Sequence, residues 1–414
     1  MDPVNIILTD LGIVSALGQG PQQTWQNLFD SPHGCMSRQS GWIDGETITV
    51  GVITEPLPDT SDWVDTDKSR CNQLTFMAYQ QIKPSVDAAI KKYGSERVGV
   101  ILGTSTSGTL EAEQAFRHQK QHGQMPKDYD YCIQEMGAPA KYVAKLAGID
   151  GLAMSVSTAC SSGAKALISA ANMLEIGMLD AVVAGGVDCL CRLTLNGFHA
   201  LESLSFDLTN PFSANRNGIN IGEGAALFMV ERAPSSIIDK DASGAVEKGD
   251  SVIVLAGFGE SSDAHHMSAP HPEGDGALGA MQQALKSSGL TIDDIDYINL
   301  HGTATAKNDL MEGTALARLG GQHVPCSSTK PFTGHTLAGA GAIEAGICYL
   351  AMSPLNSENQ LPPHHFDGIY DQQIAPLTLT AKNNRRDTPI KACLSNSFAF
   401  GGSNVSLILA RKSL

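Results

Sequence analysis

A cysteine stands where a strand-like stretch of the sequence gives way to a helix. Residues 153–156 suit a buried strand, small residues follow, and apolar residues at helical spacing begin at Gly163. Cys160 therefore falls near the N-terminus of the predicted helix, where free N–H groups and the helix dipole lower a thiol's pKa and favour a nucleophilic thiolate. A free cysteine is more often a buried structural residue, so its position alone leaves both interpretations open.

The same stretch offers a second, weaker nucleophile. Ser162 and Lys165 have the Ser-x-x-Lys spacing of serine acyltransferases related to penicillin-binding proteins. Neither Ser-Asp-Asn nor Lys-Thr-Gly follows in the sequence, so this match carries little weight.

Two histidines stand in surroundings rich in small residues. His301 follows the strand-like residues 297–300 and precedes glycine and small hydroxyl residues, a placement that faces a crevice in an α/β fold. His335 lies between Gly334 and a stretch of glycines and alanines that allows close backbone packing. A single histidine is more often structural than catalytic. The pairs His265-His266 and His364-His365 lack convincing metal-ligand spacing and no His-Glu-x-x-His occurs, so the sequence predicts no metal site. The sequence also lacks the Gly-x-x-x-x-Gly-Lys-Ser/Thr pattern of a phosphate-binding loop.

The composition excludes several classes of partner. The 414 residues include 28 basic and 43 acidic ones, a net charge of −15 that argues against general affinity for nucleic acid or anionic membranes. The nine cysteines form no Cys-x-x-Cys, and the sequence has neither a signal-peptide pattern nor a membrane-spanning apolar run. We therefore expect a soluble protein of a reducing compartment, with a cytoplasmic location.

Short runs rich in valine and isoleucine alternate with helical segments along the chain. Helices are predicted over residues 74–89, 162–176, 278–287 and 341–351. Strands are predicted over residues 5–8, 98–102, 153–156, 181–184, 226–230, 252–255, 297–300, 392–394 and 405–409. This alternation predicts α/β layers around a largely buried sheet. A polar segment at residues 234–250 separates two stretches, although the sequence reveals no internal repeat.

Four separated motifs carry a resemblance to a known family. They are Thr-Ala-Cys-Ser-Ser-Gly around Cys160, His-Gly-Thr-x-Thr from His301, Lys330 with Gly334-His335, and Asn-Ser-Phe-x-Phe-Gly-Gly from Asn396. In this order, over nearly the whole chain, they resemble the elongating Cys-His-His branch (types I and II) of the β-ketoacyl-[acyl carrier protein] synthases. The resemblance implies the thiolase fold, in which two similar βαβαβαββ halves form a five-layered α-β-α-β-α core, normally as a dimer. Residues 1–245 are expected to carry the nucleophile and residues 246–414 the two histidines.

The resemblance further implies a decarboxylative Claisen condensation. Cys160 is expected to take the acyl group as a thioester, with the backbone N–H groups of Cys160 and Phe400 forming the oxyanion hole. His301 and His335 are expected to line the malonyl site, promote loss of carbon dioxide and stabilise the enolate as neutral hydrogen-bond donors. The enolate then attacks the acyl thioester and lengthens the chain by two carbons.

Supporting roles also follow from the resemblance. Lys330 is expected to pair with Glu312 and to maintain the electrostatics of the site. Thr303 and Thr305 match residues that hydrogen-bond the pantetheine arm. No cofactor of the enzyme's own is expected, because phosphopantetheine arrives on the acyl carrier protein. The other expected site residues are Phe398 in the substrate pocket, Phe400 as the gating phenylalanine, and Gly401 and Gly402 as structural support.

The sequence departs from the family pattern at three places. Ala399 replaces the hinge glycine of Phe-Gly-Phe-Gly-Gly, and because its methyl restricts positive φ we expect the gate to move differently. The loop after Leu204 lacks the arginine with which relatives bind the acidic carrier, so docking is expected at Lys68 and Arg70 instead. Thr106 occupies a pocket position that is often aliphatic, which suggests an unusual acyl chain.

Several functions stay open within this resemblance. The chain could serve fatty-acid synthesis, or it could be the catalytic subunit of a polyene or polyketide pathway, paired with a chain-length factor; the departures favour the second. A thiolase is disfavoured because a second catalytic Cys-x-Gly is missing. A non-catalytic partner subunit usually lacks the nucleophile, which this chain keeps. The expected partners are acyl- and malonyl-loaded carrier protein and a second synthase-like subunit, in a homodimer or a heterodimer.

Overall fold

The chain is organised around one mixed sheet of 11 strands, as a computed structural model shows for residues 4–31, 35–234 and 251–413. The predicted boundary between residues 245 and 246 lies outside the described residues. The strands of the sheet are β1 (Val4–Ser15), β2 (Gly18–Gln19), β5 (Val98–Gly103), β6 (Ala153–Val156), β7 (Ala181–Asp188), β8 (Gly224–Pro234), β9 (Ser251–Ser262), β10 (Tyr297–Asn299), β11 (Cys326–Ser327), β12 (Ala392–Phe398) and β13 (Ser403–Ser413). A separate hairpin pairs β3 (Ser37–Ser40) with β4 (Thr47–Val50).

The sheet consists of two halves with the same strand order. The first half runs β1-β8-β7-β5-β6, and the second runs β9-β13-β12-β10-β11. In each half the three strands farthest from the junction are parallel, and the next strand is antiparallel to them. The halves meet where Ile7 of β1 pairs with Val254 of β9. This repeat, invisible in the sequence, confirms the predicted architecture of two similar halves.

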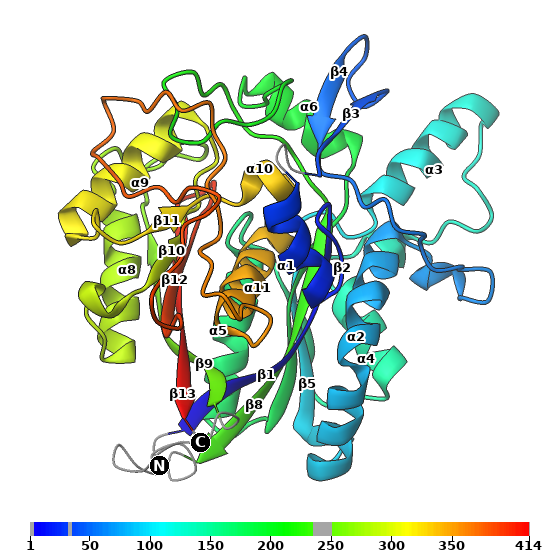
Figure 1. Cartoon of the computed structure of the whole chain (residues 1–414). Coiled ribbons are helices and arrows are strands. Elements are labelled where there is room, and N and C mark those ends of the chain that lie inside the picture. The colour runs from blue at the N-terminus through cyan, green and yellow to red at the C-terminus, as the bar shows by residue number, and fades with distance from the viewer. Residues whose placement is uncertain (1–3, 32–34, 235–250, 414) are drawn as a thin grey trace.

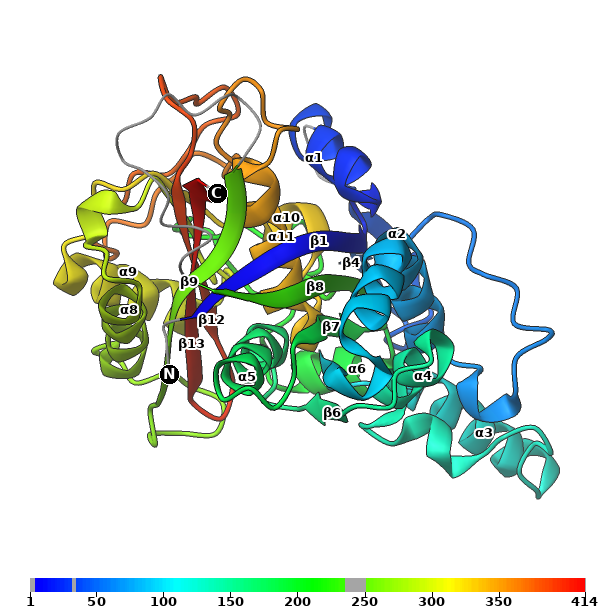
Figure 2. The same cartoon turned by 90° about the horizontal axis from the view of Figure 1, so that it is seen from below.

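Helices form three layers around the two halves of the sheet (Figure 1). The middle layer contains α5 (Ser162–Glu175) and α11 (Ala340–Met352). One outer layer contains α2 (Arg70–Tyr93) and α4 (Ala138–Ala147), and the opposite one contains α8 (Asp275–Ser288) and α9 (Ala306–Leu319). Figure 2 shows α5 between the two halves from below. The remaining helices are α1 (Pro21–Asp30), α3 (Thr109–His122), α6 (Arg192–Ala200) and α10 (Lys330–Thr333).

The middle layer is buried and closely packed. Every residue of α11 except Tyr349 is buried, as expected for a helix that is apolar on all sides apart from Glu344. A Cβ atom on Gly341 would lie 2.8 Å from the Cβ of Ala164, and one on Gly163 would lie 2.8 Å from the carbonyl oxygen of Ala338. Glycine at these two positions therefore lets α5 and α11 approach each other. Within the described part of the chain, none of the helices combines the length and hydropathy needed to cross a bilayer.

Candidate active site

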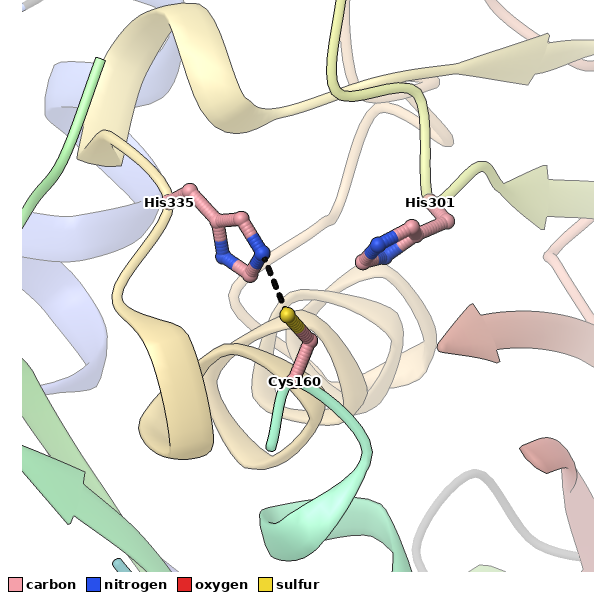
Figure 3. A group of neighbouring side chains, drawn as sticks. All are labelled: Cys160, His301 and His335. Carbon is pink, nitrogen blue, oxygen red and sulfur yellow. Dashed lines mark hydrogen bonds between the residues drawn. The ribbon is translucent and has the colours of Figure 1, made fainter. Parts of the chain in front are cut away.

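Cys160 lies in a sharp turn between β6 and α5. The preceding residue, Ala159, has a φ of 51°, a left-handed conformation that is strained for a residue with a side chain. Ser162 holds the turn, because its Oγ accepts the N–H of Thr158 at 2.8 Å and donates to the carbonyl oxygen of Ala159 at 2.6 Å. The turn leaves Cys160 only 6% exposed and aims its sulfur toward the second half of the molecule (Figure 3).

Two imidazoles from the second half meet this sulfur (Figure 3). His301 follows β10, and His335 follows α10 and Gly334. His335 Nε2 lies 3.0 Å from Cys160 Sγ, and the two rings stand at 85° with their centres 5.3 Å apart. His335 is fixed through its backbone, since its N–H donates to Asn220 at 2.7 Å and its carbonyl accepts from Gly222 at 3.0 Å. The structure thus brings together three side chains that the sequence separates by up to 175 residues.

Lys330 is a buried cation that contacts His301. It is only 1% exposed, and its Nζ donates to the carbonyl oxygen of His301 at 2.5 Å and lies 3.4 Å from His301 Nδ1. Its ion pair is with Glu344 of α11, so the predicted pairing with Glu312 is wrong. Glu312 is occupied elsewhere, because it accepts the backbone N–H groups of His301 and Gly302 at 2.8 Å each. Glu312 therefore supports the site by fixing the backbone that carries His301.

Burial decides the acidity of the Cys160 thiol. It raises the pKa of Cys160 to about 11, although the charge of Lys330 and the backbone N–H groups of Phe400 and Cys160 act to lower it. The expected lowering of this pKa at the helix N-terminus is therefore wrong, because the cost of desolvating the thiolate exceeds these favourable terms. The sulfur is a thiol at neutral pH. The two N–H groups that favour its negative form are those predicted for the oxyanion hole.

The imidazoles are neutral at physiological pH. Burial and the nearby charge of Lys330 lower the pKa values of His301 and His335 well below their usual value. A neutral imidazole can donate one hydrogen bond to a developing oxyanion and can accept one proton from a thiol. The arrangement can therefore activate a sulfur nucleophile and stabilise negative charge on oxygen in the same small volume.

The acidity of Cys160 can be tested by alkylation, since the thiolate is the reactive form. With a pKa of about 11, the rate of Cys160 carboxamidomethylation by iodoacetamide should rise roughly tenfold per pH unit between about pH 7 and about pH 10. Peptide mass spectrometry follows the modified cysteine over time. A rate that levels off below about pH 8 would contradict the raised pKa, and the urea-unfolded chain provides the reference for an unburied thiol.

Comparisons with known proteins agree with this geometry. Residues 2–235 match the family model for the beta-ketoacyl synthase N-terminal domain, and residues 252–365 match the model for the C-terminal domain. The chain belongs to the beta-ketoacyl synthase family. It is 32% identical to 3-oxoacyl-[acyl-carrier-protein] synthase 2 of Rhizobium meliloti, over 98% of each chain.

Solved structures of ketosynthases resemble this synthase over their whole length. A chain from the complex of the ketosynthase ApeO with its chain length factor ApeC, of Xenorhabdus doucetiae, is 41% identical with a TM-score of 0.88, and 98% of each chain is covered. A beta-ketoacyl synthase of Burkholderia phymatum is 28% identical with a TM-score of 0.83, covering 99% of this chain and 100% of that one. The fold and the family predicted from the four motifs are confirmed.

A cavity of about 390 Å³ opens above the sulfur and the imidazoles of the synthase. Four further residues that the sequence placed in the site line it, namely Thr303, Thr305, Phe398 and Phe400. The hydroxyls of Thr303 and Thr305 lie 3.0 Å apart. The wall also includes residues to which the sequence analysis gave no site role, among them Phe198, Leu201, Glu202, Arg216, Lys307 and Asn404.

The turn after β12 places Phe400 on the cavity wall. Gly401 and Gly402 have φ angles of 84° and 79°, so both positions require glycine, as predicted for structural support. The Phe400 ring tilts against Phe198 of α6, with the ring centres 5.5 Å apart. Ala399 does not have a positive φ, so its methyl is accommodated in this conformation. An altered movement of the gate remains a prediction.

Thr106 lies outside the lining of this cavity, and its expected role in substrate binding stays a prediction. It is 1% exposed, and its hydroxyl and its N–H both donate to Asp188 Oδ1 at 2.8 Å. Asp188 is fully buried and also accepts the N–H of Ala338. A buried carboxylate requires such donors, so Thr106 serves a structural network that joins the two halves.

Arg70 is also not available as a docking cation. Its guanidinium donates to both carboxylate oxygens of Glu223, at 2.6 Å and 2.5 Å, and the Glu223 side chain is 0% exposed. Lys68 forms a surface pair with Asp65 at 2.9 Å and keeps 35% of its side chain exposed. The prediction that Arg70 docks the carrier is therefore wrong, because its charge neutralises the buried carboxylate of Glu223. A docking role of Lys68 stays a prediction.

The buried pair makes a prediction about stability. Arg70→Met should lower the free energy of unfolding by about 3–5 kcal/mol, because it leaves the Glu223 carboxylate buried without its cation. Lys68→Met, the matched control on the surface, should cost less than about 1 kcal/mol. Urea unfolding followed by circular dichroism measures both. Equal effects of the two substitutions would show that Arg70 is not an internal partner of Glu223.

Glu344 is the functional residue that the sequence analysis overlooked. It lies on α11, where its neighbours are apolar, and it is 2% exposed. A carboxylate on an otherwise apolar buried helix needs a cationic partner, and that signal was present in the sequence. The cavity residues Phe198 and Arg216 gave no comparable signal, because their proximity to Cys160 arises only from the fold.

Proposed function

We propose that the chain is the catalytic ketosynthase subunit that condenses an acyl group with a malonyl unit delivered on carrier protein. The observation that carries this proposal is the 3.0 Å contact between Cys160 Sγ and His335 Nε2, beside a second neutral imidazole in a cavity of about 390 Å³. A buried thiol is suited to covalent transfer, and the paired imidazoles are suited to an enolate.

In the first half-reaction the Cys160 sulfur attacks the acyl thioester of the carrier. A new carbon–sulfur bond forms, the bond to the pantetheine sulfur breaks, and the Cys160 proton passes through His335 to the leaving thiolate. Two N–H groups favour negative charge on the thiol, those of Phe400 and Cys160. We propose that the same groups hold the oxyanion of the tetrahedral intermediate. Each such donor is worth roughly 100- to 1,000-fold in rate.

In the second half-reaction malonyl thioester loses carbon dioxide. The electrons of the broken carbon–carbon bond move into an enolate, whose oxygen accepts hydrogen bonds from His301 and His335. The enolate carbon then attacks the acyl group on Cys160, a carbon–carbon bond forms, and the carbon–sulfur bond to Cys160 breaks. The released Cys160 thiolate takes up one proton from solvent, and the product is a 3-oxoacyl thioester longer by two carbons.

The pathway proposed is a secondary one, in which this subunit pairs with a chain length factor. The 41% identity to a chain from the ApeO–ApeC complex supports this choice over fatty-acid synthesis. A partner is also favoured by β6, which is the outermost strand of its half and leaves all four of its residues half-buried (Figure 2). We further propose a cytoplasmic location, which the nine unpaired cysteines support, and no resident cofactor.

Reconstitution tests the proposal. The purified chain is incubated with acyl carrier and malonyl carrier, alone and with the neighbouring gene product most similar to it. We expect a 3-oxoacyl product with one carbon dioxide released per condensation, at a rate that depends on the second subunit. Condensation at full rate by the chain alone would favour the fatty-acid pathway, and acyl transfer to coenzyme A without carbon dioxide release would indicate a thiolase.

A further inference from the structure

The three reactive side chains also form a set of metal-ligand atoms. The cysteine sulfur and one ring nitrogen from each of His301 and His335 lie within 4.8 Å of one another. All three residues are buried, with exposures of 6% or less. Their sequence positions hide this set, because His301 and His335 come from the opposite half of the molecule to Cys160.

The donor types match zinc, and the donor atoms lie close enough together to converge on one ion. Zinc sites with an open fourth position have three protein ligands, among them sets that combine cysteine and histidine, with bonds of about 2.3 Å to sulfur and about 2.0–2.1 Å to nitrogen. Those bonds place donor atoms roughly 3.3–3.6 Å apart around a tetrahedral ion. The Cys160 sulfur and His335 Nε2 are 3.0 Å apart and all three donor atoms lie within 4.8 Å of one another, so side-chain rotations must bring the set to this spacing when zinc binds.

The surroundings leave the required atoms available. His301 Nδ1 faces Lys330 Nζ at 3.4 Å, which leaves the other ring nitrogen for a metal. The charge of Lys330 is paired with Glu344, which reduces its repulsion of Zn²⁺, and the thiolate form of Cys160 would supply a negative charge to the ion. The cavity of about 390 Å³ has room for a water or an anion as the fourth ligand.

We propose that Cys160, His301 and His335 bind one Zn²⁺ ion and thereby hold the synthase in a reversibly blocked state. The Cys160 proton leaves to solvent as the sulfur–zinc bond forms, and no oxidation or reduction takes place. The sulfur then cannot attack a thioester, and neither imidazole can donate to an enolate. Because an acylated sulfur is no longer a thiolate ligand, acylation and zinc binding exclude each other. The metal site rests on the donor atoms alone and does not depend on which acyl chain the synthase uses.

Cobalt provides a spectroscopic test that does not require activity. Co²⁺ is titrated into the full-length protein, and the sulfur-to-cobalt charge-transfer band and the visible bands of tetrahedral cobalt are recorded. We expect saturation at one equivalent and displacement of both signals by Zn²⁺. Cys160→Ser should lose the charge-transfer band, and His301→Ala and His335→Ala should each weaken binding at least tenfold. Cys132→Ser, which removes an exposed free cysteine outside the cavity, should leave the spectrum unchanged.

Protection from alkylation tests the same site in the unaltered protein. One equivalent of Zn²⁺ should slow iodoacetamide modification of Cys160 at least tenfold without slowing that of Cys132, and a chelator should restore the original rate. The proposal is overturned if Cys160 is not protected, if the charge-transfer band survives in Cys160→Ser, or if it is lost in Cys132→Ser. These experiments measure metal binding and not condensation. A negative result would therefore contradict the zinc site without contradicting the ketosynthase reaction, and a loss of condensing activity would not contradict the zinc site.

Discussion

Cys160→Ala should abolish acylation of the enzyme and condensation, lowering the condensation rate by at least about 1,000-fold, because the sulfur that holds the acyl group is missing. Intact-mass spectrometry after incubation with acyl carrier should detect the acyl adduct on the unaltered chain and none on the variant. The loss is expected to be in catalysis rather than folding, since alanine removes one sulfur atom at the edge of a cavity that already exists. Circular dichroism and thermal unfolding check that the fold persists.

Cys132→Ala is the matched control for this experiment, because Cys132 is a free but exposed cysteine that does not line the cavity. It should form the adduct and condense at the normal rate. Full condensing activity of Cys160→Ala would contradict the proposed function, whatever activity Cys132→Ala shows. Free decarboxylation of malonyl carrier by Cys160→Ala is compatible with the proposal, because both imidazoles remain in place.

His301→Ala should separate the two half-reactions. His301 faces Cys160 across the cavity but is not the imidazole in contact with the sulfur, which is His335 at 3.0 Å. We expect carbon dioxide release from malonyl carrier to fall about 100- to 1,000-fold, the usual loss for one oxyanion donor, while acylation of Cys160 stays within about tenfold. Radiolabelled carbon dioxide and intact mass measure the two steps separately.

His335→Ala should also lower the acylation rate, because His335 receives the proton of Cys160, but decarboxylation should fall further. His301→Gln offers a conservative comparison, since its amide can donate a hydrogen bond and should recover part of the decarboxylation rate. If His301→Ala releases carbon dioxide at the normal rate, the proposed enolate role is wrong. If acylation and decarboxylation fall equally in His301→Ala, the residue acts on the shape of the site as a whole.

Strands and helices with a clear pattern were predicted well. The strand at residues 153–156 and the helix at residues 162–176 occur as β6 and α5 with nearly the same bounds. The strand predicted at residues 5–8 is part of the longer β1, whose register shifts between Leu8 and Asp10, where the apolar pattern breaks. The helix α3 was not predicted, because only Ala112 and Ala115 of its residues are buried and the sequence is mostly polar there.

The sequence predicted the catalytic residues of the site but not which buried carboxylate pairs with Lys330, because that pairing depends on the tertiary structure. The four motifs identified Cys160 and the two histidines, which the structure brings together. They could not tell that Lys330 pairs with Glu344, because Glu312 is a second buried carboxylate nearby. Only the structure shows that Glu312 instead accepts the backbone N–H groups of His301 and Gly302. Nor could they indicate that burial outweighs the helix N-terminus in setting the acidity of Cys160, because desolvation depends on what the second half places above the sulfur.

Gly163 and Gly341 lie where α5 packs against α11, so they help to set the distance between Cys160 in the first half and His335 in the second half. Cys160 moves with α5, and His335 lies just before α11, so the spacing of the two helices is transmitted to the gap between sulfur and nitrogen. A misplacement of about 1 Å can cost a reaction roughly 100-fold. The alignment of the reacting atoms thus depends on two positions that contribute no side chain. A single methyl group added at either glycine could therefore slow the synthase without replacing any group that takes part in the chemistry.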